Sequence, residues 1–206
     1  MKLNRRSAFL GLAVATLGLL ALGSSQARAT IIPNLDSVIN NNNGTFTYNY
    51  HADLAADQRV DPAGTKSDFL TIYDFAGLVS GSAHVNQAGW TVSVQNIGIT
   101  PPSTLPTDDP TIPNITITHS DTVGTITGPQ NPLITFSAIS SAGPVGIIAF
   151  AAQATRSTGP LVGTKIQNVG VVNGPGFVPE PASLALLGIG VPFALTLLRR
   201  KKAKAT

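Results

Sequence analysis

The fold class is decided by one stretch of the chain, Phe46-Thr47-Tyr48-Asn49-Tyr50-His51-Ala52-Asp53-Leu54. Aromatic and aliphatic side chains fill every second position, and polar side chains fill all four positions between them. This is the period of a β-strand with one buried face. The turn-forming residues Asn42-Asn43-Gly44 come just before it. The sequence therefore predicts a strand over residues 46–54, entered through a tight turn.

Strand-like segments recur along the rest of residues 30–169. Residues 145–152 are apolar on both faces, which predicts a central strand. Glu is absent between Thr30 and Pro179, and this segment is rich in Gly, Ser, Thr, Asn, Pro and Val, which disfavours helices. We therefore predict an all-β mature domain at residues 30–169, an antiparallel β-sandwich or a jelly-roll-like fold. Further strands are predicted at residues 69–75, 90–94, 115–118, 133–137 and 165–169.

Two segments rich in proline or glycine interrupt this pattern. Residues 101–113 contain five prolines, which predicts an exposed loop inside the domain rather than a domain boundary. Residues 170–177 are rich in glycine and predict a flexible spacer between the domain and the C-terminal segment.

Residues 1–29 have the order of a secretory signal peptide, with a basic start at residues 2–6 and an apolar run at residues 8–22. The run has about 15 residues, whereas a membrane-spanning helix needs about 20. A permanent N-terminal anchor is therefore the less favoured alternative to a cleaved signal-peptide helix.

The expected cleavage site is marked by the small residues Ala27 and Ala29, with Thr30 as the first residue of the mature protein. The pair Arg5-Arg6 also suggests a twin-arginine signal. Phe9 lies one position too far from this pair for that consensus, so the general secretory route is favoured. Signal peptidase and the secretion machinery are the partners that this segment predicts.

The C-terminal segment, residues 178–206, combines a short motif, an apolar run and a basic end. The apolar run at residues 182–198 would reach about 26 Å as a helix, close to the thickness of a bilayer core of about 30 Å. It is apolar on every face, so a transmembrane helix is favoured over an amphipathic core helix. The basic end should stay on the cytoplasmic side, which leaves the mature domain outside. It contains Arg199, Arg200, Lys201 and Lys202.

These three parts in this order resemble the PEP-CTERM sorting signal of Gram-negative and related bacteria. The resemblance covers residues 178–204 and centres on Val178, Pro179, Glu180 and Pro181. It implies recognition of these four residues by an exosortase, an integral-membrane cysteine protease, and cleavage near the motif. It also implies a transient membrane anchor and delivery to the cell envelope, surface or extracellular matrix, usually alongside exopolysaccharide.

The nominal net charge of +3 arises from the two ends of the chain. The mature segment has four basic residues against nine aspartates, a net charge of −5 before Glu180 is counted. Nucleic-acid binding is therefore excluded, because an acidic domain is repelled by phosphates. The absence of cysteine excludes thiol catalysis, cysteine-ligated zinc and iron–sulfur clusters. The four basic residues are Arg59, Lys66, Arg156 and Lys165.

No local catalytic motif occurs in the mature segment. Its three histidines, His51, His84 and His119, do not have helical metal-ligand spacing. A Ser–His–Asp triad that forms only in the fold stays open as a hydrolase alternative. The sequence therefore predicts no catalytic residue, no cofactor and no metal.

Two groups of residues suggest a lectin-like alternative, a carbohydrate- or calcium-binding surface module. The aspartates do not match a known calcium loop, so solvated loop positions are favoured. The aromatic residues could form a platform for a sugar ring, although core positions are favoured for an alternating strand. The leading hypothesis remains an exported, non-catalytic surface or matrix protein. The two groups are Asp53, Asp57, Asp61, Asp68, Asp108 and Asp109, and Tyr48, Tyr50, Tyr73 and Trp90.

Overall fold

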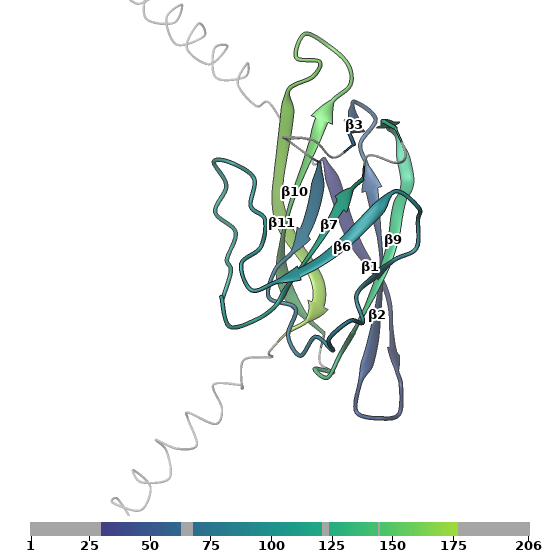
Figure 1. Ribbon diagram of the computed structural model, residues 1–206, viewed down its shortest axis with the longest axis vertical. Helices are drawn as coiled ribbons and strands as arrows, with labels where there is room; N and C mark the ends of the chain where they lie inside the picture. The colour runs from purple at the N-terminus through teal and green to yellow at the C-terminus, as the bar shows by residue number, and fades with distance from the viewer. Residues whose placement is uncertain (1–29, 63–67, 121–123, 144, 177–206) are drawn as a thin grey trace, which may run out of the picture.

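The computed structural model describes residues 30–62, 68–120, 124–143 and 145–176 (Figure 1). Within these ranges the chain forms β-strands and no α-helix, which confirms the all-β class. The same ranges contain no helix long and apolar enough to span a bilayer. The strands are β1 (Ile31–Asn40), β2 (Phe46–Leu54), β3 (Gln58–Val60), β4 (Phe69–Ile72), β5 (His84–Val85), β6 (Trp90–Gln95), β7 (Asn114–His119), β8 (Ile126–Thr127), β9 (Gln130–Ser140), β10 (Val145–Arg156) and β11 (Lys165–Pro175).

The first sheet has four strands in the order β1-β2-β9-β5, and all of its pairs are antiparallel. Its second strand, β2, covers residues 46–54 as predicted. The alternation of this strand sets its two faces, since Tyr48, Tyr50 and Ala52 are buried while the residues between them are partly exposed. A hairpin joins β1 to β2, closed by the amide N–H of Asn41, which donates to the carbonyl oxygen of Thr45 at 3.0 Å.

The second sheet has seven strands, and β10 lies at its centre. One side of β10 pairs with β11 along its length, and the other side pairs with β4 and β3. The remaining strands extend the sheet through β7 to β6 and through β3 to β8, again in antiparallel pairs. The predicted central strand at residues 145–152 is therefore confirmed, and Ala151 and Ala152 are completely buried.

The two sheets pack face to face on one hydrophobic core, as in a β-sandwich. The core cluster contains aromatic side chains of the first sheet, such as Tyr50 and Phe136, and aliphatic and aromatic side chains of the second, such as Ile117 and Phe150. The rings of Tyr50 and Phe136 stack with centroids 4.9 Å apart and an interplanar angle of 6°. This core forms without disulfides, because the chain has no cysteine.

The first strand, β1, is not evident from the sequence. Its apolar alternation is broken by a register shift between Leu35 and Ser37, where Asp36 is the extra residue of a β-bulge. Pro33 is also unfavourable inside a sheet, but β1 pairs only with β2 and can accept a residue without an N–H group. Leu35 and Val38 both pack against the core as a result of the bulge.

The predicted flexible spacer at residues 170–177 is wrong over residues 170–175, which belong to β11. The register runs without a break from Lys165 opposite Thr155 to Pro175 opposite Val145. Glycine at position 174 has a packing role here, because a Cβ atom would lie 2.2 Å from the Cδ1 atom of Ile148. The folded domain therefore ends at residue 176, later than the predicted boundary at residue 169.

The first and last described residues lie at opposite ends of the long axis (Figure 1). The carbonyl oxygen of Thr30 accepts a hydrogen bond from Ala55 N at 3.2 Å, just beyond the end of β2. The carbonyl oxygen of Pro175 accepts one from Ala76 N at 3.3 Å, at the other end. Ala76 in turn accepts a hydrogen bond from Ser140 Oγ, and Ser140 pairs with the first residue of β2.

Candidate functional site

Most of the residues predicted for export and sorting lie outside the described residues. These are Ala27 and Ala29 of the signal peptide, the motif at residues 178–181, the predicted transmembrane helix and the basic end at residues 199–202. Thr30, the predicted first residue of the mature protein, is described and completely buried. The part of the sorting site that the structure describes is therefore the end of the domain from which the chain leaves toward the motif.

We call this region the exit end, and four segments of the chain build it (Figure 1, lower end). The β1–β2 hairpin contributes one segment, and the turn between β9 and β10 contributes another. A loop after β4 pairs with the end of β9 and with this turn, since Val79 N donates to Ile139 O at 2.8 Å and Ser141 N donates to Gly77 O at 2.9 Å. The last segment is the end of β11. The described residues of the four segments are 39–46, 76–82, 140–143 with 145–147, and 173–176.

The sorting motif begins close to this end, because only residues 176–178 separate Pro175 from Pro179. Four steps of extended chain reach at most about 14 Å. An enzyme that recognises the Pro-Glu-Pro sequence must therefore act next to the folded domain.

The exit end is uncharged. None of its four segments contains Asp, Glu, Lys, Arg or His. The ion pairs of the second sheet lie at the opposite end, where β3, β10 and β11 meet. Three ion pairs lie there: Asp57 with Arg156, Arg59 with Asp61, and Asp68 with Lys165. Three further aspartates, Asp74, Asp108 and Asp109, lie in the loops next to residue 76 and are linked there by hydrogen bonds.

These ion pairs also answer the question of a calcium site. Asp57, Asp61 and Asp68 each bind a basic side chain, at N–O distances of 3.3, 2.8 and 2.7 Å respectively. Among the described residues, no group of three or more His, Asp or Glu side chains is arranged to hold a metal ion. The prediction of solvated loop positions is therefore wrong for Asp57 and Asp68, whose side chains are 12% and 0% exposed and are paired with basic side chains.

Asp68 is the most enclosed of these carboxylates, and its side chain is completely buried. Its oxygens accept hydrogen bonds from Lys165 Nζ at 2.7 Å, Thr155 Oγ1 at 2.9 Å and the amide N–H of Asp61 at 2.8 Å. Burial raises the pKa of Asp68, while the three donors and the charge of Lys165 oppose that shift. The network joins the loop before β4 to β10 and β11.

The aspartates of the proline-rich loop form hydrogen bonds that hold the loop against the second sheet. Asp108 accepts hydrogen bonds from Gly98 N at 3.0 Å and from the Asn114 amide at 2.9 Å. Asp74 accepts one from Asp109 N at 2.8 Å, and burial raises the pKa of Asp74, as do the charges of Asp108 and Asp109. The loop connects β6 to β7 within one sheet, so it is not a domain boundary, as predicted.

The three histidines do not support the hydrolase alternative. On β2, His51 Nδ1 contacts Asp36, and its Nε2 lies 3.8 Å from Asp53 Oδ2, whereas a triad histidine must offer one nitrogen to a serine. His84 is exposed on β5. His119 is buried against Trp90, with ring centroids 4.9 Å apart, and its ring nitrogens have no hydrogen-bond partner among the described residues.

The candidate aromatic platform is part of the core. Tyr48, Tyr50 and Tyr73 are almost completely buried, and Trp90 is only 8% exposed. Burial raises the pKa of each of the three tyrosines. The core interpretation of these residues is confirmed, and they present no surface on which a sugar ring could stack.

The two buried tyrosines of β2 differ in their hydroxyl groups, which gives a testable prediction. Tyr48 Oη donates to the carbonyl oxygen of Ala142 at 2.9 Å, whereas Tyr50 Oη has no hydrogen-bond partner among the described residues. Tyr48→Phe should lower the free energy of unfolding by about 1 kcal/mol, while Tyr50→Phe should leave it unchanged or raise it. Urea unfolding of both variants measures this. An equal loss in both would contradict the assignment.

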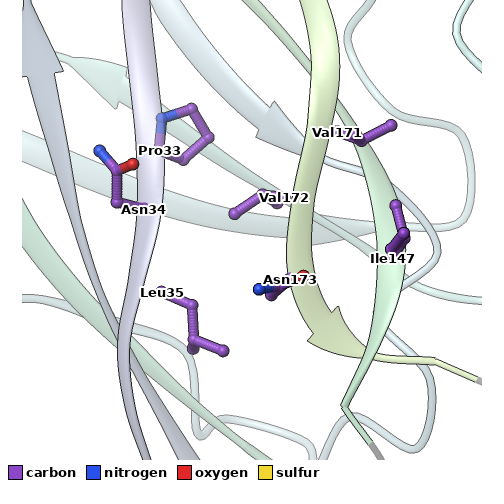
Figure 2. Close-up of a pocket in the computed structure, with 7 residues that line it drawn as sticks. All are labelled: Pro33, Asn34, Leu35, Ile147, Val171, Val172 and Asn173. Atoms are coloured by element: carbon purple, nitrogen blue, oxygen red, sulfur yellow. The ribbon is translucent and has the colours of Figure 1, made fainter.

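A groove of about 310 Å³ lies between β1 and the β10–β11 pair (Figure 2). In Figure 2, Leu35 of β1 and Val172 of β11 extend into the space between these two strands. The lining contains two asparagines but no titratable side chain, so the groove offers no acid, base or nucleophile. It is lined by Pro33, Asn34, Leu35, Ile147, Val171, Val172 and Asn173.

Comparison with known proteins identifies the segment that follows the exit end. Residues 177–202 match the family model of the PEP-CTERM protein-sorting motif. No curated protein matches the chain. The chain therefore carries a PEP-CTERM sorting signal, as its sequence predicted, and this signal implies an exported protein that an exosortase processes.

Proposed function

We propose, from the premise that this chain is a PEP-CTERM sorting-signal protein, that its mature domain is a non-catalytic component of the cell surface or extracellular matrix. The precursor is held at the membrane by its C-terminal segment. An exosortase recognises Pro179, Glu180 and Pro181 and cleaves nearby, and the released domain associates with exopolysaccharide.

The single observation that carries this proposal is the position of the motif. The match at residues 177–202 begins one residue after the described domain ends at residue 176. A folded domain is thus followed immediately by the sorting signal, with no intervening module. The role proposed for the domain is non-catalytic because His51, Asp57, Asp68 and Asp108 are held in ion pairs or hydrogen bonds that stabilise the fold. Of the other two histidines, His84 is exposed and His119 is buried against Trp90. The lectin-like alternative gains no support, since the candidate aromatic residues are buried.

The proposal predicts that Glu180→Ala abolishes processing. In the native host, the wild-type protein should yield a soluble species that begins at Thr30 and ends near Pro179. The variant should stay in the membrane fraction and keep its tail, because the exosortase loses the charged residue of the motif. Intact-mass measurement of medium, envelope and membrane fractions decides this.

Ser183→Ala is the matched control, since residue 183 lies just beyond the Pro-Glu-Pro sequence. This variant should be processed like the wild type. A wild-type protein that remains in the membrane and still carries residues 199–206 would overturn the sorting proposal. The chain would then be a permanently anchored surface protein.

A further inference from the structure

We infer that the exit end docks on the outward surface of the membrane while the tail is uncleaved, with exposed aliphatic side chains entering the headgroup region. The partner is the bilayer itself. This inference rests on the proposed function, because it requires the C-terminal segment to be anchored. The side chains concerned are those of Ile39, Val79, Val145 and Ile147.

The short connection supports this orientation. Pro175 and the Pro-Glu-Pro sequence are separated by three residues, so an anchored tail holds the end of β11 close to the bilayer. The hairpin, the β9–β10 turn and the loop after β4 all lie at this same end (Figure 1). The ion pairs at the opposite end point away from the membrane in this orientation.

The absence of charge supports a lipid partner. Moving a charged side chain into the membrane interface carries a desolvation cost, and none of the four segments contains one. The nearest titratable side chains along the chain from residues 76–82 are Asp74 and His84, each two residues away. Asp74 is held in the hydrogen-bond network of the proline-rich loop, and His84 is exposed on β5. Since the exit end also lacks Lys and Arg, its binding should depend little on anionic lipid or salt.

The exit end also exposes aliphatic side chains around its rim. Ile39 is 53% exposed, Val79 37%, Val145 49% and Ile147 73%. Two of these flank the end of β11, since Val145 pairs with Pro175 and Ile147 pairs with Asn173. Aliphatic side chains gain free energy when they enter the boundary between headgroups and acyl chains.

A weak intrinsic affinity is sufficient for this docking. A short tether gives its cargo an effective concentration of about 1 mM or more at the surface to which it is attached. Cleavage by the exosortase removes the tether and with it this concentration. Docking is therefore tied to the uncleaved state, and the freed domain should leave the membrane.

The test uses the chain without its signal peptide, residues 30–206, in phosphatidylcholine vesicles. The protein has no cysteine, so a single introduced cysteine can carry an environment-sensitive fluorophore. Ser80→Cys places the probe at the exit end, and Thr158→Cys places it in the exposed β10–β11 loop at the opposite end. Nitroxide lipids should quench the first probe at least about twofold more strongly than the second, because an interfacial group lies within about 10 Å of the headgroups.

Matched double variants identify the responsible side chains. In the Ser80→Cys background, Ile39→Ser with Val145→Ser should remove most of the excess quenching. Leu161→Ser with Val162→Ser should leave it unchanged, because these two residues are similarly exposed but lie at the opposite end.

The outcomes separate the docking from the anchor on which it rests. Loss of the protein from vesicles at alkaline pH would overturn the proposed anchor and the docking together. Retention with equal quenching of both probes would overturn the docking alone. A third outcome is a change in the fluorescence of the Ser80→Cys probe that grows with the protein-to-lipid ratio but is not quenched by nitroxide lipids. This outcome would mean that the exit end binds a second copy of the chain, and it would also overturn the inference.

Discussion

Lys165→Met is expected to lower the free energy of unfolding by about 3 kcal/mol, because it leaves a buried carboxylate without its cation. Asp68 is completely buried, and Lys165 Nζ donates to it at 2.7 Å and to Thr155 Oγ1 at 2.7 Å. Methionine keeps most of the side-chain volume and removes the charge. Denaturant unfolding at neutral pH gives the measurement.

The matched control is Arg59→Met, which also removes one cation from an ion pair with aspartate. Asp61, its partner, is 25% exposed and can be rehydrated. Exposed or half-exposed ion pairs contribute about 0.2–1 kcal/mol, so this variant should lose much less stability. Equal losses in the two variants would contradict a special role for the buried pair.

The deficit of Lys165→Met should shrink in acid. Burial already raises the pKa of Asp68, and removal of the ammonium group should raise it further. An aspartate with a raised folded-state pKa is most favourable when protonated, below the unfolded-state pKa, and loses stability as the pH rises through the folded-state pKa. The variant should therefore approach the wild type as the pH falls toward the ordinary aspartate pKa of 3.8. A deficit that stays constant from neutral pH to this value would mean that lost packing causes it.

The ion pairs of Asp57, Asp61 and Asp68 could not be predicted from the sequence. Asp68 and Lys165 are 97 residues apart, and no local pattern links them. The sequence instead groups Asp68 with Asp57 and Asp61, which raises a calcium site only as an alternative to solvated loop positions. In the fold each of these carboxylates has its own basic partner. Two of those partners, Arg156 and Lys165, lie 99 and 97 residues later in the sequence than the aspartates that they bind.

The fold class could be predicted because strand alternation is a local property. In β2 the alternation is unbroken, so both bounds of the strand are correct. In β1 one extra residue at Asp36 shifts the alternation, and a period-two pattern no longer describes it. The order of strands in the sheets depends on long-range pairing, which local patterns do not encode.

The exit end was partly readable from the sequence. Each of its segments has the composition of an uncharged turn or strand end, and the tail motif was recognisable from Pro179-Glu180-Pro181 and its flanks. Their convergence beside the motif was not readable, because it depends on the antiparallel pairing of β10 with β11. The glycines near residue 174 suggested flexibility, whereas in the fold they allow close packing.

The extension of β11 leads to the second large expected effect. Val172→Asp should lower the free energy of unfolding by about 4 kcal/mol, because it places a carboxylate in the apolar core. Val172 is only 6% exposed and belongs to the core cluster. Val171→Asp is the matched control, since the adjacent side chain is 66% exposed and points to the other face of the strand. This control should lose less than about 1 kcal/mol.

The contrast between these neighbours distinguishes a strand from a spacer, because only a paired strand has alternating faces. A flexible spacer would tolerate aspartate at both positions and leave unfolding unchanged. Thermal and urea unfolding of the two variants therefore measure where the domain ends. Loss of stability in Val172→Asp alone fixes β11 in the sheet through Pro175 and keeps the sorting motif within four residues of the folded domain. Tolerance of both substitutions would return residues 170–175 to the role of a linker, and the docking of the exit end would lose its short tether.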